Sequence, residues 1–341
     1  MKLQKKQKSV KKHCHYCPPP FIKNTSRIPT TPYATCYLWN LCCLLLYWAV
    51  MLASSAWGEG LNMHIKTSPP QPGQGEAILL TITSTFDNTP TSLLFQGKTL
   101  NFQPCPRDLE PISPEATCYF TLLPIPLNMT PGSHNITIHI SKAGHMESLI
   151  VPVHIISKHY PEEHLTVEQK MVEFPEETLA RIKEEQQAMV AAMSHETNLI
   201  YWTPWFHWPV SSEIKSPFGL RRFFNGQPRA PHAGIDLKGA VGDPVRAANN
   251  GRVIFVKDCY LSGNTIIIDH GYGLYSIYCH LSKTYVTPEE EVQKDQIIGE
   301  VGKTGRATGA HLHWGISLHG VRIDPQSLMR LLGGHTSKSI P

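Results

Sequence analysis

The sequence predicts a mainly β protein in which a small β-sandwich and a second antiparallel sheet domain are joined by a helix. Three observations predict this fold class. Short runs of alternating apolar and polar residues fill residues 61–157, and turn pairs such as Pro72-Gly73 separate them. The same pattern returns after Ile214, with glycines between the runs. Between the two regions, only residues 173–198 have a clear helical pattern.

The length and charge of the chain fit two modest domains and an N-terminal extension. The chain has 341 residues, of which 41% are hydrophobic and 17% charged, as in a globular protein with cores. Its formal charge of +4 comes from the extension, because residues 1–56 contain eight Lys or Arg residues and no acid. The remainder has 23 basic residues against 27 acidic ones. Nothing beyond the extension therefore indicates a nucleic acid as partner.

Residues 1–56 are predicted to be a signal peptide. A lysine-rich start is followed by an apolar run, Leu41–Ala53, and by small residues up to Ala56. The run is shorter than the ~20 residues that span a bilayer. Residues 37–57 would just reach that length, so an uncleaved membrane anchor is the alternative. Either way, we expect the rest of the chain to be exported to the periplasm or the extracellular space.

Residues 60–157 are predicted to form the first domain, an antiparallel β-sandwich. Its expected strands are 77–83, 92–95, 116–122, 135–140 and 148–155. Cys105 and Cys118 fall in this domain, and Cys259 and Cys279 fall in the second. In an exported chain these numbers fit one disulfide in each domain. Free buried thiols are the alternative, above all for Cys259 and Cys279.

A linker helix is expected within residues 170–200. Pro175 suits its first turn, and the acidic residues Glu176 and Glu177 suit the positive end of its dipole. Apolar residues at Leu179 and Ile182 begin a partial stripe. The helix either packs on one of the domains as a connection or lies over a groove as a gate. The aromatic run after it, residues 201–209, fits a plug between domains or a platform for sugar rings.

The second domain, residues 212–330, contains a histidine pattern that indicates a metal site. His232 and Asp236 form an HxxxD motif, and His311 and His313 form an HxH motif. Residues two apart on a strand share a face, so His311 and His313 should point into one cleft. A catalytic zinc ion takes three protein ligands and leaves one position open. A further histidine, His280, lies in a YxHLS segment, next to Cys279, which should face the opposite side.

The rest of this domain is expected to be short strands, and no HExxH motif is present. The expected strands are 244–248, 251–256, 264–269, 274–278, 296–301 and 313–318. Residues 325–332 should form a final helix that Asp324 caps. Arg221, Arg222 and Asn225 precede the first motif and are candidates to line a groove.

These motifs, with the flanking blocks SPFGLR and GRATGAHLHWG, resemble those of the lysostaphin-type, or LytM-domain, zinc metallopeptidases over residues 214–328. Members of that family cut peptide cross-links in bacterial peptidoglycan. The resemblance implies that His232, Asp236 and His313 hold one Zn²⁺ and that His280 and His311 are catalytic. The first domain is similar to an immunoglobulin-like module found ahead of the peptidase domain in some relatives.

The resemblance implies an exported zinc endopeptidase that acts on stem or bridge peptides, with a D-alanyl cross-link as the expected bond. The motifs contain no glutamate to serve as base, so His280 or His311 would take the proton from water. Which of the two does so stays open. A non-catalytic activator of another wall hydrolase is the main alternative, although such relatives usually lack a ligand. A structural zinc protein would favour four protein ligands.

Overall fold

The computed structural model describes residues 55–57, 63–84, 88–106, 116–166, 173–195 and 197–332. The predicted leader lies outside these residues, apart from Ser55 and Ala56 at its end. The described part is mainly β, as predicted, with two helices. Among the described residues, neither helix is long and apolar enough to cross a membrane.

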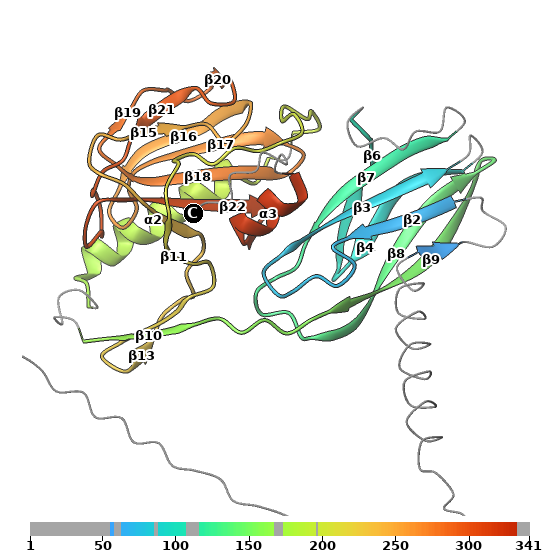
Figure 1. Cartoon of the computed structure of the whole chain (residues 1–341), viewed down its shortest axis with the longest axis horizontal. Helices are drawn as coiled ribbons and strands as arrows, with labels where there is room; N and C mark the ends of the chain where they lie inside the picture. Colours follow the sequence, from blue (N-terminus) through green and yellow to red (C-terminus); the bar gives the residue numbers. More distant parts are fainter. Residues whose placement is uncertain are drawn as a thin grey trace, which may run out of the picture. The chain divides into compact units, whose positions relative to one another are not determined.

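The first region consists of two antiparallel sheets that enclose one apolar core (Figure 1). The five-stranded sheet contains, in spatial order, β1 (Ser55–Trp57), β2 (Met63–Ser68), β3 (Ala77–Ser84), β7 (Thr117–Pro124) and β6 (Gln103–Pro104). The four-stranded sheet contains β5 (Lys98–Asn101), β4 (Asn88–Phe95), β8 (Gly132–Lys142) and β9 (His145–Ile155). Alternation explains the core, because Ile136, Ile138 and Ile140 on β8 are fully buried and the residues between them are not. The similarity to an immunoglobulin-like module stays a prediction.

The cysteines of the two regions differ. Cys105, just after β6, forms a disulfide with Cys118 on β7, with their Cα atoms 5.3 Å apart. Cys259 and Cys279 are buried free thiols. The disulfide expected in the first region is therefore present, and the free-thiol alternative holds for the second pair.

The second region is built on an eight-stranded antiparallel sheet. Its strands, in spatial order, are β11 (Ile214–Ser216), β14 (Ile235–Lys238), β22 (His311–Leu318), β18 (Leu274–Leu281), β17 (Gly263–Gly271), β16 (Gly251–Cys259) and β20 (Glu291–Val292), with β23 (Val321–Ile323) beside β22. Two small sheets contain β15 (Pro244–Arg246), β21 (Ile297–Glu300) and β19 (Lys283–Thr284), and β10 (Glu162–Leu165), β12 (Arg221–Phe224) and β13 (Gln227–Pro228). Almost all residues of the central strands β17 and β18 are buried, because both faces of the sheet are covered there.

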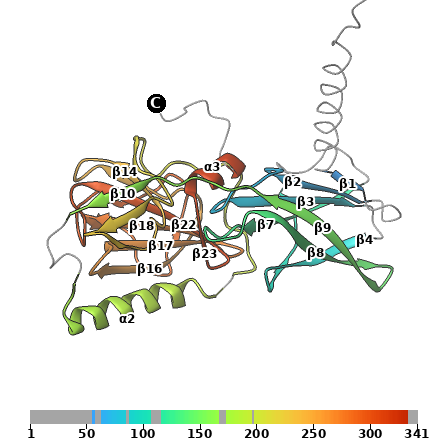
Figure 2. The same ribbon diagram turned by 90° about the horizontal axis from the view of Figure 1, so that it is seen from below.

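The helix α2 (Glu176–Ala192) covers part of one face of this sheet (Figure 2). Its Met189 packs in a cluster with Phe255 of β16 and Ile277 of β18. The buried carboxylate of Glu185 accepts hydrogen bonds from the Tyr260 backbone N–H at 2.8 Å and from Arg181 Nε at 2.7 Å. The helix is shorter than the predicted stretch. It packs on the second region, which agrees with the first of the two interpretations, a connection packed on one of the domains.

Two residues of the aromatic run pack in the apolar cluster that contains side chains of both β regions, whereas Trp205 of the same run is exposed. Trp202 and Phe206 are buried, and the Trp202 ring meets Phe120 of β7 edge-on at a centroid distance of 5.9 Å. The final helix α3 (Pro325–Leu332) matches its predicted bounds. Asp324 caps it, because the Gln326 backbone N–H donates to Asp324 Oδ1 at 3.0 Å.

Candidate metal centre

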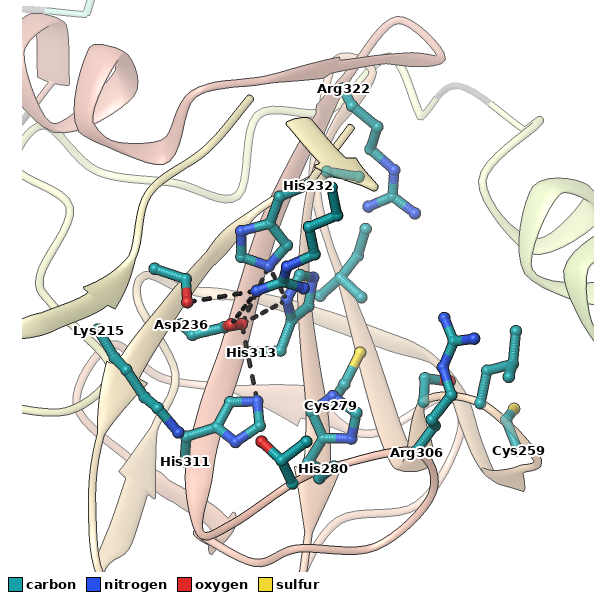
Figure 3. A pocket seen from close by; sticks show the side chains of 18 of the residues that line it. Lys215, His232, Asp236, Cys259, Cys279, His280, Arg306, His311, His313 and Arg322 are labelled. Carbon is teal, nitrogen blue, oxygen red and sulfur yellow. Dashed lines mark hydrogen bonds and ion pairs between the residues drawn. The ribbon is translucent and has the colours of Figure 1, made fainter. Parts of the chain in front are cut away.

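Two neighbouring strands bring the three expected metal ligands together. Asp236 on β14 stands opposite His313 on β22 in the antiparallel register, so both side chains share one face. His232 lies four residues before Asp236, and all three side chains point toward one another (Figure 3). The three facing atoms, His232 Nε2, Asp236 Oδ1 and His313 Nδ1, lie 3.0 Å from one another in each pair.

This triangle has the dimensions of a metal site. A tetrahedral zinc ion with bonds of ~2.0–2.1 Å separates its ligand atoms by roughly 3.3 Å. His232 Nδ1 donates to the Pro217 carbonyl at 2.8 Å, so the neutral ring presents a lone pair at Nε2. At most one proton, on His313 Nδ1, can then lie among the three atoms. One proton cannot satisfy three contacts of 3.0 Å, whereas one cation can.

The two other expected histidines lie beside this group. The His280 and His311 ring centroids are 4.8 Å apart, and the His280 centroid is 6.1 Å from that of His313. His280 Nδ1 donates to the Thr304 carbonyl at 2.9 Å, and His311 Nδ1 donates to the Gly309 carbonyl at 2.8 Å. In the neutral form each ring therefore presents an unprotonated Nε2, and the backbone carbonyl fixes this tautomer.

The position of His280 corrects an expectation from strand geometry. Cys279 stands opposite His313 in the register, so strict alternation would turn His280 to the other face. Cys279 and His280 nevertheless line the same pocket as the three expected metal ligands. The backbone of His280 has φ of 65°, a left-handed conformation that breaks the alternation. A non-glycine residue in this conformation is strained, and such strain is often found at functional sites.

Burial and neighbouring groups set the charges of the site. Burial lowers the pKa of His280 to about 4, and the nearby His313 and His311 add to the effect, so its ring is neutral near pH 7. For Asp236, burial favours the protonated acid, but the interactions with the adjacent imidazoles of His232 and His313 outweigh it. The pKa of Asp236 consequently lies well below its usual range, and the carboxylate is ionised. The site thus combines one anionic and several neutral donors.

A pocket of about 500 Å³ contains all five histidine and aspartate side chains. Arg222 lines it, with Nε 3.1 Å from Glu163 and Nη2 3.6 Å from Asp236 Oδ2. Arg221 instead pairs with Glu162, at 2.6 Å, and is not among the lining residues.

Asn225 lies in the turn between β12 and β13, also outside the pocket lining. Several lining residues could not be found from the motifs. They come from α2, β10, β23 and the loop before β22, and include Ile182, Glu185, Leu165, Arg306 and Arg322.

Comparisons with known proteins agree with this geometry. Residues 230–325 match Peptidase family M23. The DD-carboxypeptidase/endopeptidase Mpg of Neisseria meningitidis is 37% identical over 119 residues, which are 35% of this chain and 27% of that protein. The peptidoglycan DD-endopeptidase ShyA of Vibrio cholerae is 38% identical over 116 residues, which are 33% of this chain and 27% of that protein. The chain thus matches about a quarter of the length of either relative.

A solved structure extends the similarity beyond the matched segment. A Pseudomonas aeruginosa protein assigned to peptidase M23 superposes with a TM-score of 0.57 and 27% sequence identity. The superposition covers 76% of this chain and 95% of that protein. The motifs, the fold and these similarities lead to one conclusion: residues 230–325 are a LytM-type domain of Peptidase family M23.

Proposed function

We propose that this protein is an exported zinc endopeptidase that hydrolyses peptide cross-links of bacterial peptidoglycan. The observation that carries the proposal is the triangle of 3.0 Å between His232 Nε2, Asp236 Oδ1 and His313 Nδ1, with two further histidines beside it. Two relatives have names that include peptidoglycan DD-endopeptidase or DD-carboxypeptidase/endopeptidase, which supports a cross-link with a D-alanyl residue as the substrate.

The donor set suits zinc. Imidazole nitrogen and carboxylate oxygen are both ligands of this borderline cation, and three protein ligands leave a fourth position for solvent or substrate. His232, Asp236 and His313 would hold the ion, and the Pro217 carbonyl fixes the tautomer of the first ligand. A zinc ion, when bound, polarises a carbonyl oxygen and lowers the pKa of its water to ~7.

The remaining work falls to His280 and His311. Their unprotonated Nε2 atoms can accept the proton that water loses and then return it to the leaving nitrogen. The glutamates of the pocket are engaged elsewhere: Glu163 pairs with Arg222, and Glu185 pairs with Arg181 and the Tyr260 N–H. We therefore assign the acid–base work to the two histidines, with the division between them open. Once one of them has taken up the proton at Nε2, that N–H could also donate a hydrogen bond to the developing oxyanion.

A non-catalytic activator of another wall hydrolase is the alternative. It would need a pocket that binds the wall but lacks a complete set of reacting groups. All five side chains are present, and they line one pocket. The complete set favours the enzyme.

Two variants separate metal binding from turnover. We expect His313→Ala to lose both zinc and activity, because two ligands are too few to hold the ion tightly. We expect His280→Ala to retain one zinc per chain and to lose about 10²–10⁴-fold in kcat, because its Nε2 transfers protons but does not hold the metal. Zinc content by mass spectrometry and hydrolysis of a cross-linked muropeptide dimer are measured on the same preparations.

The matched control is His154→Ala, which removes an exposed histidine from β9 of the first region. It should keep both zinc and activity. A fully active His280→Ala would show that the role assigned to this residue is wrong. A zinc-loaded wild type that cleaves no dimer would favour the activator.

A further inference from the structure

We propose that Arg322, with Arg306, forms a subsite that binds a free carboxylate of the substrate next to the metal ligands. This inference rests on the proposed peptidase function and adds a substrate feature to it. A peptide with a carboxylate near the cleaved bond would be selected, and the same peptide with that carboxylate amidated would be bound weakly. Peptidoglycan stem peptides carry such carboxylates.

The strand register places Arg322 on the face of the sheet that holds the metal ligands. Arg322 on β23 stands opposite Ser317 on β22, and Ser317 shares a face with Gly315 and His313. Gly315 leaves room above the strand, since a Cβ atom there would lie 3.3 Å from Arg322 Nη1. The arginine therefore lies across the glycine, and its guanidinium lines the same pocket as His313 (Figure 3).

Neither arginine has an acidic partner in the part of the chain that the structure describes. Several other arginines have acidic partners, such as Arg181 with Glu185 at 2.7 Å and Arg222 with Glu163 at 3.1 Å. Among the described residues, no ion pair and no side-chain hydrogen bond reaches the guanidinium of Arg306 or Arg322. Arginine stays charged, and Arg322 is partly buried. A charge withdrawn from water without a partner costs free energy, so a binding role explains it better than a structural one.

Arg306 brings a second positive charge to the same pocket. Its backbone N–H donates to the Leu261 carbonyl at 2.8 Å, which ties the loop before β22 to the β16–β17 turn. Burial lowers its pKa, and the nearby positive charges of Arg229 and Arg222 lower it further. The pocket lining thus carries the positive charges of Arg306 and Arg322, an arrangement that suits an anion taken up from outside.

The acidic side chains of the pocket cannot neutralise these two arginines. Glu163 is held by Arg222, Glu185 by Arg181 and the Tyr260 N–H, and Asp236 faces the metal site. The ligand must therefore bring the negative charge. A carboxylate suits it best, because guanidinium and carboxylate are planar and form two parallel hydrogen bonds.

The test compares two ligands on protein that cannot turn them over. Zinc-loaded full chain with His280→Ala is titrated, by calorimetry, with a cross-linked muropeptide dimer and with the same dimer after its carboxylates have been converted to methylamides. We expect the free acid to bind about tenfold more tightly or better, as for a charge-assisted bidentate pair. Adding Arg322→Gln should bring the two affinities within about threefold by weakening only the acid. Adding Arg306→Gln should reduce the preference in part.

Controls separate charge, fold and function. Adding Arg252→Gln removes an exposed arginine paired with Glu289, away from the pocket lining, and should keep the full preference. Arg322→Lys keeps the charge but not the planar fork, so it should restore only part of the preference. Zinc content and thermal unfolding of each variant show whether it folds. If Arg322→Gln does not fold, Arg306→Gln, which changes an exposed residue of the loop, is used to test the subsite instead.

Three results would each overturn the subsite. The His280→Ala protein could bind the free acid and the methylamide with equal affinity, it could bind neither dimer, or the preference for the acid could persist after Arg322→Gln. The peptidase proposal is judged separately, by hydrolysis of both dimers with the zinc-loaded wild type. Equal kcat/KM values for the two dimers would support the peptidase function but contradict the carboxylate subsite. Cleavage of neither dimer would contradict the peptidase itself.

Discussion

At the scale of the residue, backbone carbonyls decide which histidine nitrogen faces the pocket. The carbonyls of Pro217, Thr304 and Gly309 each accept the Nδ1 proton of a different histidine, which leaves three Nε2 lone pairs for the metal or the substrate. The rings need no rearrangement of protons before they act. Preorganisation of this kind reduces the reorganisation needed during the reaction.

A buried histidine outside the site should make stability depend on pH. His270 on β17 is fully buried, with Nδ1 2.7 Å from the Asn250 carbonyl and Nε2 2.7 Å from Ser276 Oγ. Burial lowers its pKa from 6.5 to about 4. Between these values the unfolded chain binds a proton that the folded chain does not, so stability is lost as the pH falls from 6.5 to 4. The loss amounts to ~3 kcal/mol over the window, at 1.36 kcal/mol per pKa unit.

Urea unfolding of wild type and His270→Gln at pH 7.5 and pH 4.5 measures this contribution. Chelator is present in all samples, so that bound metal does not change between them. The variant should be less stable at pH 7.5 but should lose less stability than wild type on acidification. An equal loss in both proteins would show that His270 does not titrate in this window.

The HxxxD, YxHLS and HxH motifs, together with their resemblance to the LytM-domain peptidases, predicted the five residues that the structure brings together in one pocket. HxxxD and HxH each fix two side chains within one turn or strand, and the matching flanks resemble those of known peptidases. Arg322 could not be predicted, because it reaches the pocket only through the pairing of β23 with β22. The left-handed backbone of His280 gave no signal in sequence either, since strand patterns assume alternation.

At the scale of the element, α2 both connects the two β regions and lines one side of the pocket. Its apolar face packs on the sheet, while Ile182 and Gln186 line the pocket. The two interpretations drawn from the sequence are thus compatible, and a gating movement stays a prediction. The pattern placed the helix but overestimated its length, because charged residues continue past both ends.

The buried carboxylate of Glu185 should anchor this helix. Glu185→Ala removes the acceptor of the Tyr260 N–H and of Arg181, and leaves a backbone donor unsatisfied. We expect a loss of ~1–3 kcal/mol in the free energy of unfolding, measured by urea denaturation. Glu184→Ala, at the exposed neighbouring position, should change it by less than ~0.5 kcal/mol. Equal effects of the two substitutions would contradict the anchor.

The strands show which parts of a sheet a sequence reveals. Apolar runs predicted the central strands β16, β17 and β18, and the residues of β17 and β18 are buried on both faces. The short strands β11, β12 and β13 were not predicted, because two to four residues carry too little pattern. The parallel pairing of β10 with β12 joins segments more than fifty residues apart, which no local signal could indicate.

At the scale of the whole molecule, the two β regions share apolar contacts. Ala77 and Phe120 of the first region belong to the same buried cluster as Trp202 and Trp314 of the second. The Ala77 N–H donates to Ser327 Oγ at 3.0 Å, and Arg330 Nη2 lies 2.8 Å from Glu76. We infer that the first region supports the peptidase fold, since removing it would expose this cluster to water.

The most direct measurement is digestion of peptidoglycan sacculi by the purified protein, with the products identified by mass spectrometry. Three samples are compared: zinc-loaded protein, protein treated with chelator, and treated protein with zinc restored. The account predicts uncrosslinked peptides in the first and third samples only, with the new ends naming the bond. Intact cross-links in all three samples, despite one bound zinc per chain, would contradict it.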